Sequence, residues 1–268
     1  MNEVNKTVKK LKTARTLIVV VYAIVVFAIT LFTIIGVSLE TDPEVMDQTF
    51  TGFVVVMVAL MAVYLFALTF LGLRVDRILL NECDPVKYYG VFNGFSKSKR
   101  TPKYLVTQVS LMTSTFSGDF RAAMDSAEEL MASKKPILRL LGYSHYLNAA
   151  YYLNEMELFN RFLEDFKSME KLSRSRRYVV TYKEVLNDSL RLKALADGDV
   201  EKALQYLEKA QSKFINNIQK AQYEYNKGET YFAAGEKEKA VEAFMKTKEI
   251  CGKTYYGRFA DMYLEKLH

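Results

Sequence analysis

Two long apolar blocks without a charged residue constrain this chain more than any other feature of its sequence. The first runs from Leu17 to Leu39 and the second from Phe50 to Leu73, where Arg74 ends it. As helices rising about 1.5 Å per residue, blocks of this length extend roughly 35 Å, which is enough to cross the hydrocarbon core of a bilayer. We therefore predict transmembrane helices over residues 17–39 and 50–74.

The flanks of these blocks predict how the hairpin is oriented. Residues 40–49 contain four acids and no base, and we expect them to form a short acidic extracytoplasmic loop. Basic residues lie on the other side, at Lys6, Lys9, Lys10, Lys12 and Arg15 before the first block and at Arg74 and Arg77 after the second. Because such residues are retained on the cytoplasmic side, the basic N-terminus over 1–16 and everything after the hairpin are predicted to be cytoplasmic.

Two further expectations concern the membrane itself. A cleavable signal peptide is the alternative to the first span, but its apolar run is usually only about 7 to 15 residues long. The blocks contain no charged side chain that would form a proton relay, an ion site or a voltage sensor. We therefore interpret the hairpin as an anchor, in what we expect to be a bacterial plasma membrane.

The remaining residues, 75–268, have the pattern of an all-α domain. A helix-stopping residue followed by an acid occurs four times, at Gly118-Asp119, Asn154-Glu155, Gly198-Asp199 and Gly235-Glu236. Taking Gly118, Glu155, Gly198 and Gly235 as equivalent positions, the spacings are 37, 43 and 37 residues. A period of this length indicates stacked helical pairs.

The last of these units resembles a tetratricopeptide repeat. Gly228 and Tyr231 match the G-x2-Y of the first repeat helix, and Ala240 and Phe244 match the A-x3-F of the second. The resemblance covers 184–251 and, with fewer matching residues, 104–170. It implies a cytoplasmic α-solenoid of about four helical pairs, closed by a capping helix over 255–268. A helical bundle without repeats is the alternative.

A tetratricopeptide-like array implies a concave groove that binds a peptide or a helix of a partner protein. On the first helix of each pair, the side chains that would line this groove are Gln108, Met112, His145, Ala149, Tyr152, Asp188, Leu192, Tyr225, Glu229 and Phe232. These residues combine aromatic and aliphatic anchors with isolated polar groups, which suits a peptide or short helix. The alternative is that the chain's own terminal helix covers these side chains.

Catalytic chemistry finds little support in the sequence. Of the two histidines, His268 is terminal and His145 has no cysteine or carboxylate at a metal-binding spacing. Cys83 and Cys251 are interpreted as single, buried thiols in a reducing compartment. We expect no catalytic residue, metal site or cofactor, and we do not expect an enzyme.

Two basic runs remain, one over 97–103 and one over 171–177. Residues 75–268 contain 31 bases and 26 acids, an excess too small and too dispersed to indicate nucleic-acid binding. Contact with anionic lipid and plain solvated loops are both open interpretations. The sequence as a whole predicts a membrane-anchored interaction or scaffold module for a protein partner. A regulatory or sensor subunit of a membrane transporter, enzyme or signalling complex is the alternative.

Overall fold

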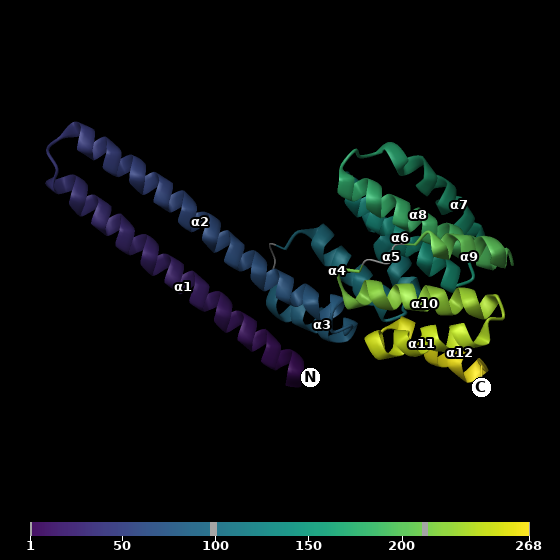
Figure 1. Ribbon diagram of the computed structural model, residues 1–268. Helices are drawn as coiled ribbons and strands as arrows, with labels where there is room; N and C mark the ends of the chain where they lie inside the picture. Colours follow the sequence, from purple (N-terminus) through teal and green to yellow (C-terminus); the bar gives the residue numbers. More distant parts are fainter. Residues whose placement is uncertain (1, 97–100, 211–213, 268) are drawn as a thin grey trace. The chain divides into compact units, whose positions relative to one another are not determined.

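The computed structural model describes residues 2–96, 101–210 and 214–267, and all regular structure within these ranges is helical. The predicted all-α class is therefore confirmed. The chain divides into two compact units (Figure 1). The first comprises residues 1–76 and 91–96, and the second comprises 77–90 and 97–268. Each unit is described separately below.

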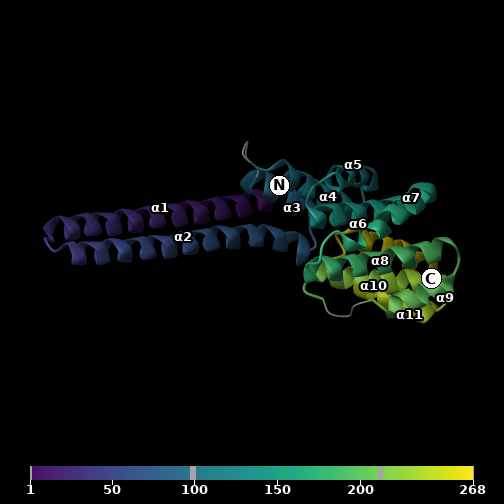
Figure 2. The ribbon, with the colours of Figure 1, turned by 90° about the horizontal axis from the view of Figure 1, so that it is seen from above.

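The first unit is a hairpin of two long helices, α1 (Asn2–Leu39) and α2 (Pro43–Leu80). They lie side by side along their length (Figure 2), and the rings of Tyr22 and Tyr64 stack with centroids 4.4 Å apart. The connecting loop is shorter than the expected 40–49. Helix α2 already begins at Pro43, because the Asp42 carboxylate accepts a hydrogen bond from the Glu44 backbone N–H at 2.9 Å.

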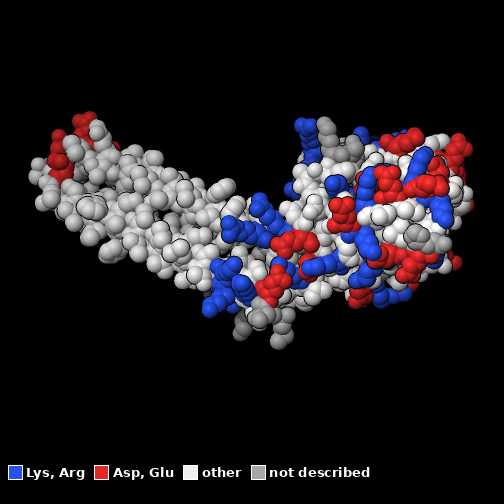
Figure 3. Space-filling view, turned by 60° about the horizontal axis from the view of Figure 1, so that its bottom comes forward, with Lys and Arg blue, Asp and Glu red and all other residues white. Residues whose placement is uncertain are grey.

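Both helices are long and apolar enough to cross a membrane, and almost none of the side chains in their most apolar stretches are buried. Figure 3 shows acidic residues at the tip of the hairpin, a length without charge, and basic residues where that length ends. The hydroxyls of Thr30, Thr33, Ser38 and Thr69 donate to the carbonyl four residues earlier in their own helix. These contacts satisfy the hydroxyl groups without a partner outside the helix. The hairpin is therefore compatible with insertion into a bilayer.

Short helices follow the hairpin. Helix α3 (Pro85–Val91) is followed by a π-helical turn, η1 (Phe92–Ser96), which packs against α1 in the first unit. The helices of the second unit are α4 (Lys103–Phe116), α5 (Phe120–Met131), α6 (Pro136–Tyr152), α7 (Met156–Lys167), η2 (Ser168–Lys171), α8 (Arg176–Ala196), α9 (Val200–Glu208), α10 (Asn217–Ala233), α11 (Lys237–Cys251) and α12 (Tyr255–Leu267).

The four predicted helix breaks are confirmed, and they share one backbone turn. Gly118, Asn154, Gly198 and Gly235 all have φ between 59° and 73°, in the left-handed region. At each break the following acid donates its backbone N–H to the carbonyl five residues earlier, as in Glu155 N to Ala150 O at 2.8 Å. This bond is the signature of a Schellman C-cap. The turn joins α4 to α5, α6 to α7, α8 to α9 and α10 to α11, and each of these consecutive pairs packs together.

The interpretation of the two cysteines as single thiols is wrong. Cys83 and Cys251 form a disulfide, with Cα atoms 5.2 Å apart. They are separated by 168 residues, so only the packing of the helical domain brings them together. Two polar contacts flank the bond: Asn217 Nδ2 donates to Asn81 O at 2.8 Å, and Lys253 pairs with Asp84 at 2.7 Å. The segment 77–90 is thereby fastened to the last helical pair.

Helices α10 and α11 approach each other closely at Gly228. A Cβ atom added to Gly228 would lie 2.5 Å from two ring carbons of Phe244, whose side chain is fully buried. Gly228 and Phe244, two of the four residues on which the tetratricopeptide resemblance rests, therefore pack as a small residue against a large one. The solenoid arrangement of all four pairs stays a prediction.

We predict that Gly228→Leu lowers the free energy of unfolding by about 1–3 kcal/mol, because the added side chain overpacks the contact with Phe244. Lys237→Ala, at the exposed start of α11, serves as the control and should cost less than about 0.5 kcal/mol. Denaturant unfolding of the full-length protein in detergent measures both changes. Equal effects of the two substitutions would contradict the packing role of Gly228.

Candidate functional site

The C-terminal helix α12 lies across the first helices of several pairs and covers an aromatic face. Its Tyr256 ring is 6.1 Å from Phe116 of α4, and its Tyr255 ring is 5.4 Å from Tyr152 of α6. Tyr225 of α10 lies 5.3 Å from Tyr256. Aromatic pairs at such centroid distances contribute beyond their buried area. We refer to this set of rings and the polar groups beside them as the covered face.

Further along α12, Tyr263 continues the aromatic contacts. Its ring stacks on Phe244 of α11 at 4.8 Å and meets the edge of Phe232 of α10 at 4.9 Å. Phe259 lies 5.5 Å from Tyr152. The three α12 residues Tyr255, Phe259 and Tyr263 are four positions apart, so they share one side of the helix. That side is the one turned toward the domain.

Polar contacts fix where α12 begins. The Tyr255 hydroxyl donates to Asn148 Oδ1 at 3.1 Å, and the Arg258 guanidinium donates to the Ser117 carbonyl. Asn148 belongs to α6 and Ser117 follows α4, so both partners come from the first two pairs. The last helix of the domain is thus bonded to the earliest ones, and α12 closes the helical array on itself.

The predicted groove residues are buried or partly buried in the structure. Four of the ten are buried, namely Ala149, Leu192, Tyr225 and Glu229. The other six are partly buried: Gln108, Met112, His145, Tyr152, Asp188 and Phe232. The rings of Tyr152, Tyr225 and Phe232 contact α12 directly. Periodicity placed these residues on the inward side of their helices, and the structure has the alternative arrangement, in which the chain's own terminal helix α12 covers several of them. Their role in binding a partner stays a prediction.

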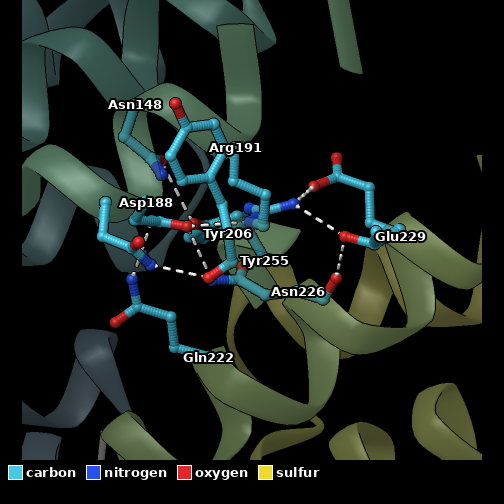
Figure 4. A network of polar contacts seen from close by, with 10 residues as sticks. Asn148, Asp188, Arg191, Tyr206, Gln222, Asn226, Glu229 and Tyr255 are labelled. Atoms are coloured by element: carbon cyan, nitrogen blue, oxygen red, sulfur yellow. Dashed lines mark hydrogen bonds and ion pairs between the residues drawn. The ribbon is translucent and has the colours of Figure 1, made fainter. Parts of the chain in front are cut away.

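An ionic network lies under the covered face, and its central residue, Arg191, was not among the residues predicted from the sequence. Arg191 stands in the position of a packing glycine, yet only 2% of its surface is exposed. Its Nη1 is 2.9 Å from Glu229 Oε2, and its Nε is 2.9 Å from Asp188 Oδ1 (Figure 4). Asn226 Nδ2 also donates to Asp188 at 2.8 Å. An arginine at a packing position, with one acid three residues earlier and another at a groove position of the next pair, is the signal that could have found this network.

The charges in this network depend on one another. Burial lowers the pKa of the Arg191 guanidinium, but the carboxylates of Asp188 and Glu229 outweigh that effect and hold the pKa above its usual value. Burial raises the pKa of the Glu229 carboxyl, and the ion pair with Arg191 offsets only part of this shift. Removing either partner would leave the other charge buried and unbalanced, which is costly.

The neighbouring titratable side chains are held in their neutral forms. Burial raises the pKa of Tyr152, Tyr225 and Tyr255 well above the usual value, and it raises that of Tyr263 to about 12. Burial also lowers the pKa of His145 to about 4, and its ring meets Phe116 edge-on at 6.1 Å. At neutral pH the covered face therefore offers aromatic surface and neutral hydrogen-bonding groups around one balanced arginine.

A surface cavity of about 430 Å³ adjoins this network between α8, α9 and α10. Asp188 and Arg191 form part of its wall, together with the carboxamides of Asn187, Gln222 and Asn226. Asn187 already donates to the Tyr206 carbonyl at 2.8 Å. Among the described residues, histidine, cysteine and acidic side chains do not gather in groups of three or more that could hold a metal ion.

No protein-family model, curated protein or solved structure matches this chain. The site is therefore defined by its own geometry: an aromatic face on α4, α6 and α10, an ionic network beneath it, and α12 seated across it.

We predict strong coupling between Arg191 and Glu229. Arg191→Met should lower the free energy of unfolding by about 3–5 kcal/mol, because it leaves buried carboxylates without a counter-charge. The double variant Arg191→Met/Glu229→Leu should be more stable than the sum of the single effects by at least about 1 kcal/mol.

The control for this cycle is the exposed ion pair between Arg121 and Glu155, in which the arginine side chain is 64% exposed. Arg121→Met should cost less than about 1 kcal/mol. Denaturant unfolding of all four variants completes the comparison. Additive effects at Arg191 and Glu229 would show that the two charges do not depend on each other.

Proposed function

We propose that this protein is a membrane-anchored interaction module, in which helical pairs resembling tetratricopeptide repeats bind a helix of a partner protein. In this proposal, α12 occupies the binding face when the partner is absent. The observation that carries the proposal is the set of aromatic contacts that α12 makes with α4, α6 and α10. An amphipathic helix laid into a groove is a recurrent mode of peptide recognition.

The side chains of α12 indicate which kind of partner helix the covered face would bind. Tyr255, Phe259 and Tyr263 supply aromatic anchors at positions i, i+4 and i+8, and Tyr255 is fully buried. Large aromatic side chains in desolvated pockets are the residues that most often dominate binding energy. The bonds from Tyr255 to Asn148 and from Arg258 to Ser117 fix the direction of the helix. A partner helix with the same aromatic spacing would fit the same contacts.

The short connection to α12 makes it a strong competitor. Three residues, 252–254, separate α11 from α12, and a linker of this kind gives an effective concentration on the order of millimolar or more. The apparent affinity for a partner is therefore the intrinsic affinity multiplied by the fraction of molecules in which α12 is released. This competition would make partner binding sensitive to anything that loosens α12.

The alternative, a sensor subunit, gains one observation from the structure. A disulfide in a cytoplasmic protein is usually transient, catalytic or redox-sensing, and here the Cys83–Cys251 bond joins the segment after α2 to the end of α11. Reduction would release that segment from the last helical pair. Under this alternative the redox state of the two cysteines is the signal.

The expected topology yields a labelling prediction. A cysteine replacing Gln48, at the exposed tip of the hairpin, should react with a membrane-impermeant maleimide on intact cells. A cysteine replacing the exposed Lys237 should react only after the membrane is opened. The native Cys83 and Cys251 should stay unlabelled in both cases until a reductant and a denaturant are added, because they are bonded to each other. The reverse labelling pattern at positions 48 and 237 would overturn the orientation.

Release of α12 is tested with the full-length protein in lipid nanodiscs and a fluorescent synthetic peptide of residues 254–268. The double variant Tyr255→Ala/Phe259→Ala weakens the protein's own α12, so it should bind the added peptide at least about tenfold more tightly than the wild type. Met262→Ala changes an exposed side chain of the same helix and should leave peptide binding unchanged. Fluorescence anisotropy measures all three affinities.

Adding Tyr152→Ala to the double variant should remove the gain, since Tyr152 contacts both Tyr255 and Phe259. Each variant is first shown to keep a cooperative thermal transition, so that loss of binding is not loss of fold. Equal peptide binding by the double variant and by Met262→Ala would contradict the proposal. A gain that survives Tyr152→Ala would place the binding surface elsewhere.

A further inference from the structure

The first helices of the pairs begin along one edge of the helical domain. Figure 1 shows α8 and α10 starting on the same side of the domain. Neighbouring first helices meet there: Lys135 Nζ lies 4.4 Å from the Tyr104 ring centroid, α6 packs against α8, and Lys183 and Gln219 line the same cavity. These contacts connect α4 to α6, α6 to α8 and α8 to α10. We call this continuous surface the basic edge, for the charges described next.

The segments that connect one pair to the next carry mostly positive charge. These segments are 132–135, 168–175, 209–216 and 252–254. Their described residues contain a single acid, Glu170. They contain six bases: Lys134, Lys135, Lys171, Arg174, Lys209 and Lys253. Arg176, Arg177 and Lys220 follow in the first turns of α8 and α10. Lys97, Lys99 and Arg100 of the first predicted basic run lie outside the described residues. By contrast, the turns within pairs, 117–119, 153–155, 197–199 and 234–236, contain five acids and no base.

The two sets of charges also differ in how they are paired. Three bases near the turns within pairs have carboxylate partners: Arg121 pairs with Glu155, Lys202 with Asp199 and Lys239 with Glu236. On the basic edge, Lys134, Arg174, Arg176, Arg177 and Lys220 are exposed and have no carboxylate partner among the described residues. Such a surface attracts an anionic partner.

Large apolar side chains are exposed among these bases. They are Tyr104, Ile137, Leu172, Val180 and Ile215. Ile215 is 88% exposed, and both Ile215 and Leu172 lie in connecting loops rather than on a helix that a second protein helix could cover. Basic residues interspersed with exposed apolar side chains are typical of surfaces that enter the headgroup region of a membrane.

The chain enters the domain beside this edge. The segment after the hairpin is held there by the bond from Asn217 to Asn81 and by the Cys83–Cys251 disulfide. Helix α2 continues unbroken to Leu80, only seven residues beyond the end of its apolar block at Leu73. If the hairpin is inserted as proposed above, the basic edge is tethered close to headgroups along the chain. This tether favours lipid over a free nucleic acid or protein as the anionic partner.

We propose that the basic edge binds the anionic headgroups of the membrane in which the hairpin is anchored. Arg174, Arg176 and Arg177 pair with lipid phosphates, and Leu172 and Ile215 enter the interface beside them. This contact fixes the orientation of the domain and leaves the acidic turns within pairs facing the aqueous phase. The inference rests on the anchoring proposed above, but it does not depend on whether α12 is displaced.

The test uses the full-length protein with an environment-sensitive fluorophore on Ile215→Cys. The native cysteines are bonded to each other and stay unlabelled without reductant. The protein is reconstituted into phosphatidylcholine vesicles with or without about 30% phosphatidylglycerol, where brominated acyl chains quench a fluorophore at the interface. Quenching should be at least about twofold greater with the anionic lipid, and about 1 M salt should remove the difference.

Two matched comparisons complete the experiment. Arg174→Glu/Arg176→Glu/Arg177→Glu should abolish the dependence on anionic lipid, whereas Lys202→Glu/Lys237→Glu/Lys239→Glu, near the turns within pairs, should preserve it. A fluorophore on Lys237→Cys should be quenched equally in both lipids. Dependence that persists in the arginine variant, or quenching at position 215 that ignores lipid charge, would overturn the inference.

Resistance of the protein to extraction with alkaline carbonate, measured in parallel, separates the two proposals. Extraction from the vesicles would contradict membrane anchoring itself and, with it, the tether on which the inference rests. A protein that stays inserted but shows no dependence on lipid charge would overturn the inference alone. In that case a protein or RNA partner would become the explanation for the basic edge.

Discussion

A guanidinium removed from water must have its charge balanced by the helices that surround it, and Arg191 imposes this condition on the helical domain. Its partners come from two helices, Asp188 on α8 and Glu229 on α10, so the relative position of these helices is set by the geometry of the ion pairs. Asn226 binds the outer carboxylate and limits its freedom. The pair of Arg191 with Glu229 joins α8 to α10, and the pair with Asp188 lies within α8 itself.

The same network explains why aromatic residues gather above it. Burial of a charge pair costs desolvation free energy, so the remaining hydrogen-bonding groups of the pair must be satisfied. The rings of Tyr152, Tyr225 and Tyr255 exclude water there, and their hydroxyls stay neutral because burial raises their pKa. Helix α12 completes this layer. The packing of α12 and the ionic network therefore stabilise each other. A partner helix that replaced α12 would have to cover the same surface.

Local features of the sequence predicted local structure well. The four helix breaks could be located because a left-handed residue at a helix C-terminus favours glycine or asparagine, and Gly118, Asn154, Gly198 and Gly235 all have that conformation. The two apolar spans followed from length and the absence of charge. The sequence Asp42-Pro43 is a typical helix start and indicates the early beginning of α2. The prediction missed it because residues 40–49 were taken together as one acidic loop.

Features that depend on tertiary packing could not be predicted in this way. Cys83 and Cys251 are 168 positions apart, and nothing in their neighbouring residues indicates that α11 ends beside the segment following α2. The inward side of each first helix was identifiable, but the helix that covers Tyr225 comes from another part of the chain. Arg191 could not be identified as the centre of an ionic network, because one counter-charge, Asp188, lies on its own helix and the other, Glu229, lies on a different helical pair.

The Cys83–Cys251 bond divides the domain into a closed loop and a free end. Helices α4 to α11 lie inside the covalent loop, whereas α12 is the one domain helix that follows it. A peptide bond cut within 84–250 would leave the C-terminal fragment joined through sulfur to the fragment that carries the hairpin, so a nicked domain would stay attached to the hairpin. A cut within 252–254 would instead detach α12 as a separate peptide. Proteolysis at those three positions could therefore uncover the aromatic face permanently while the rest of the protein stayed in place.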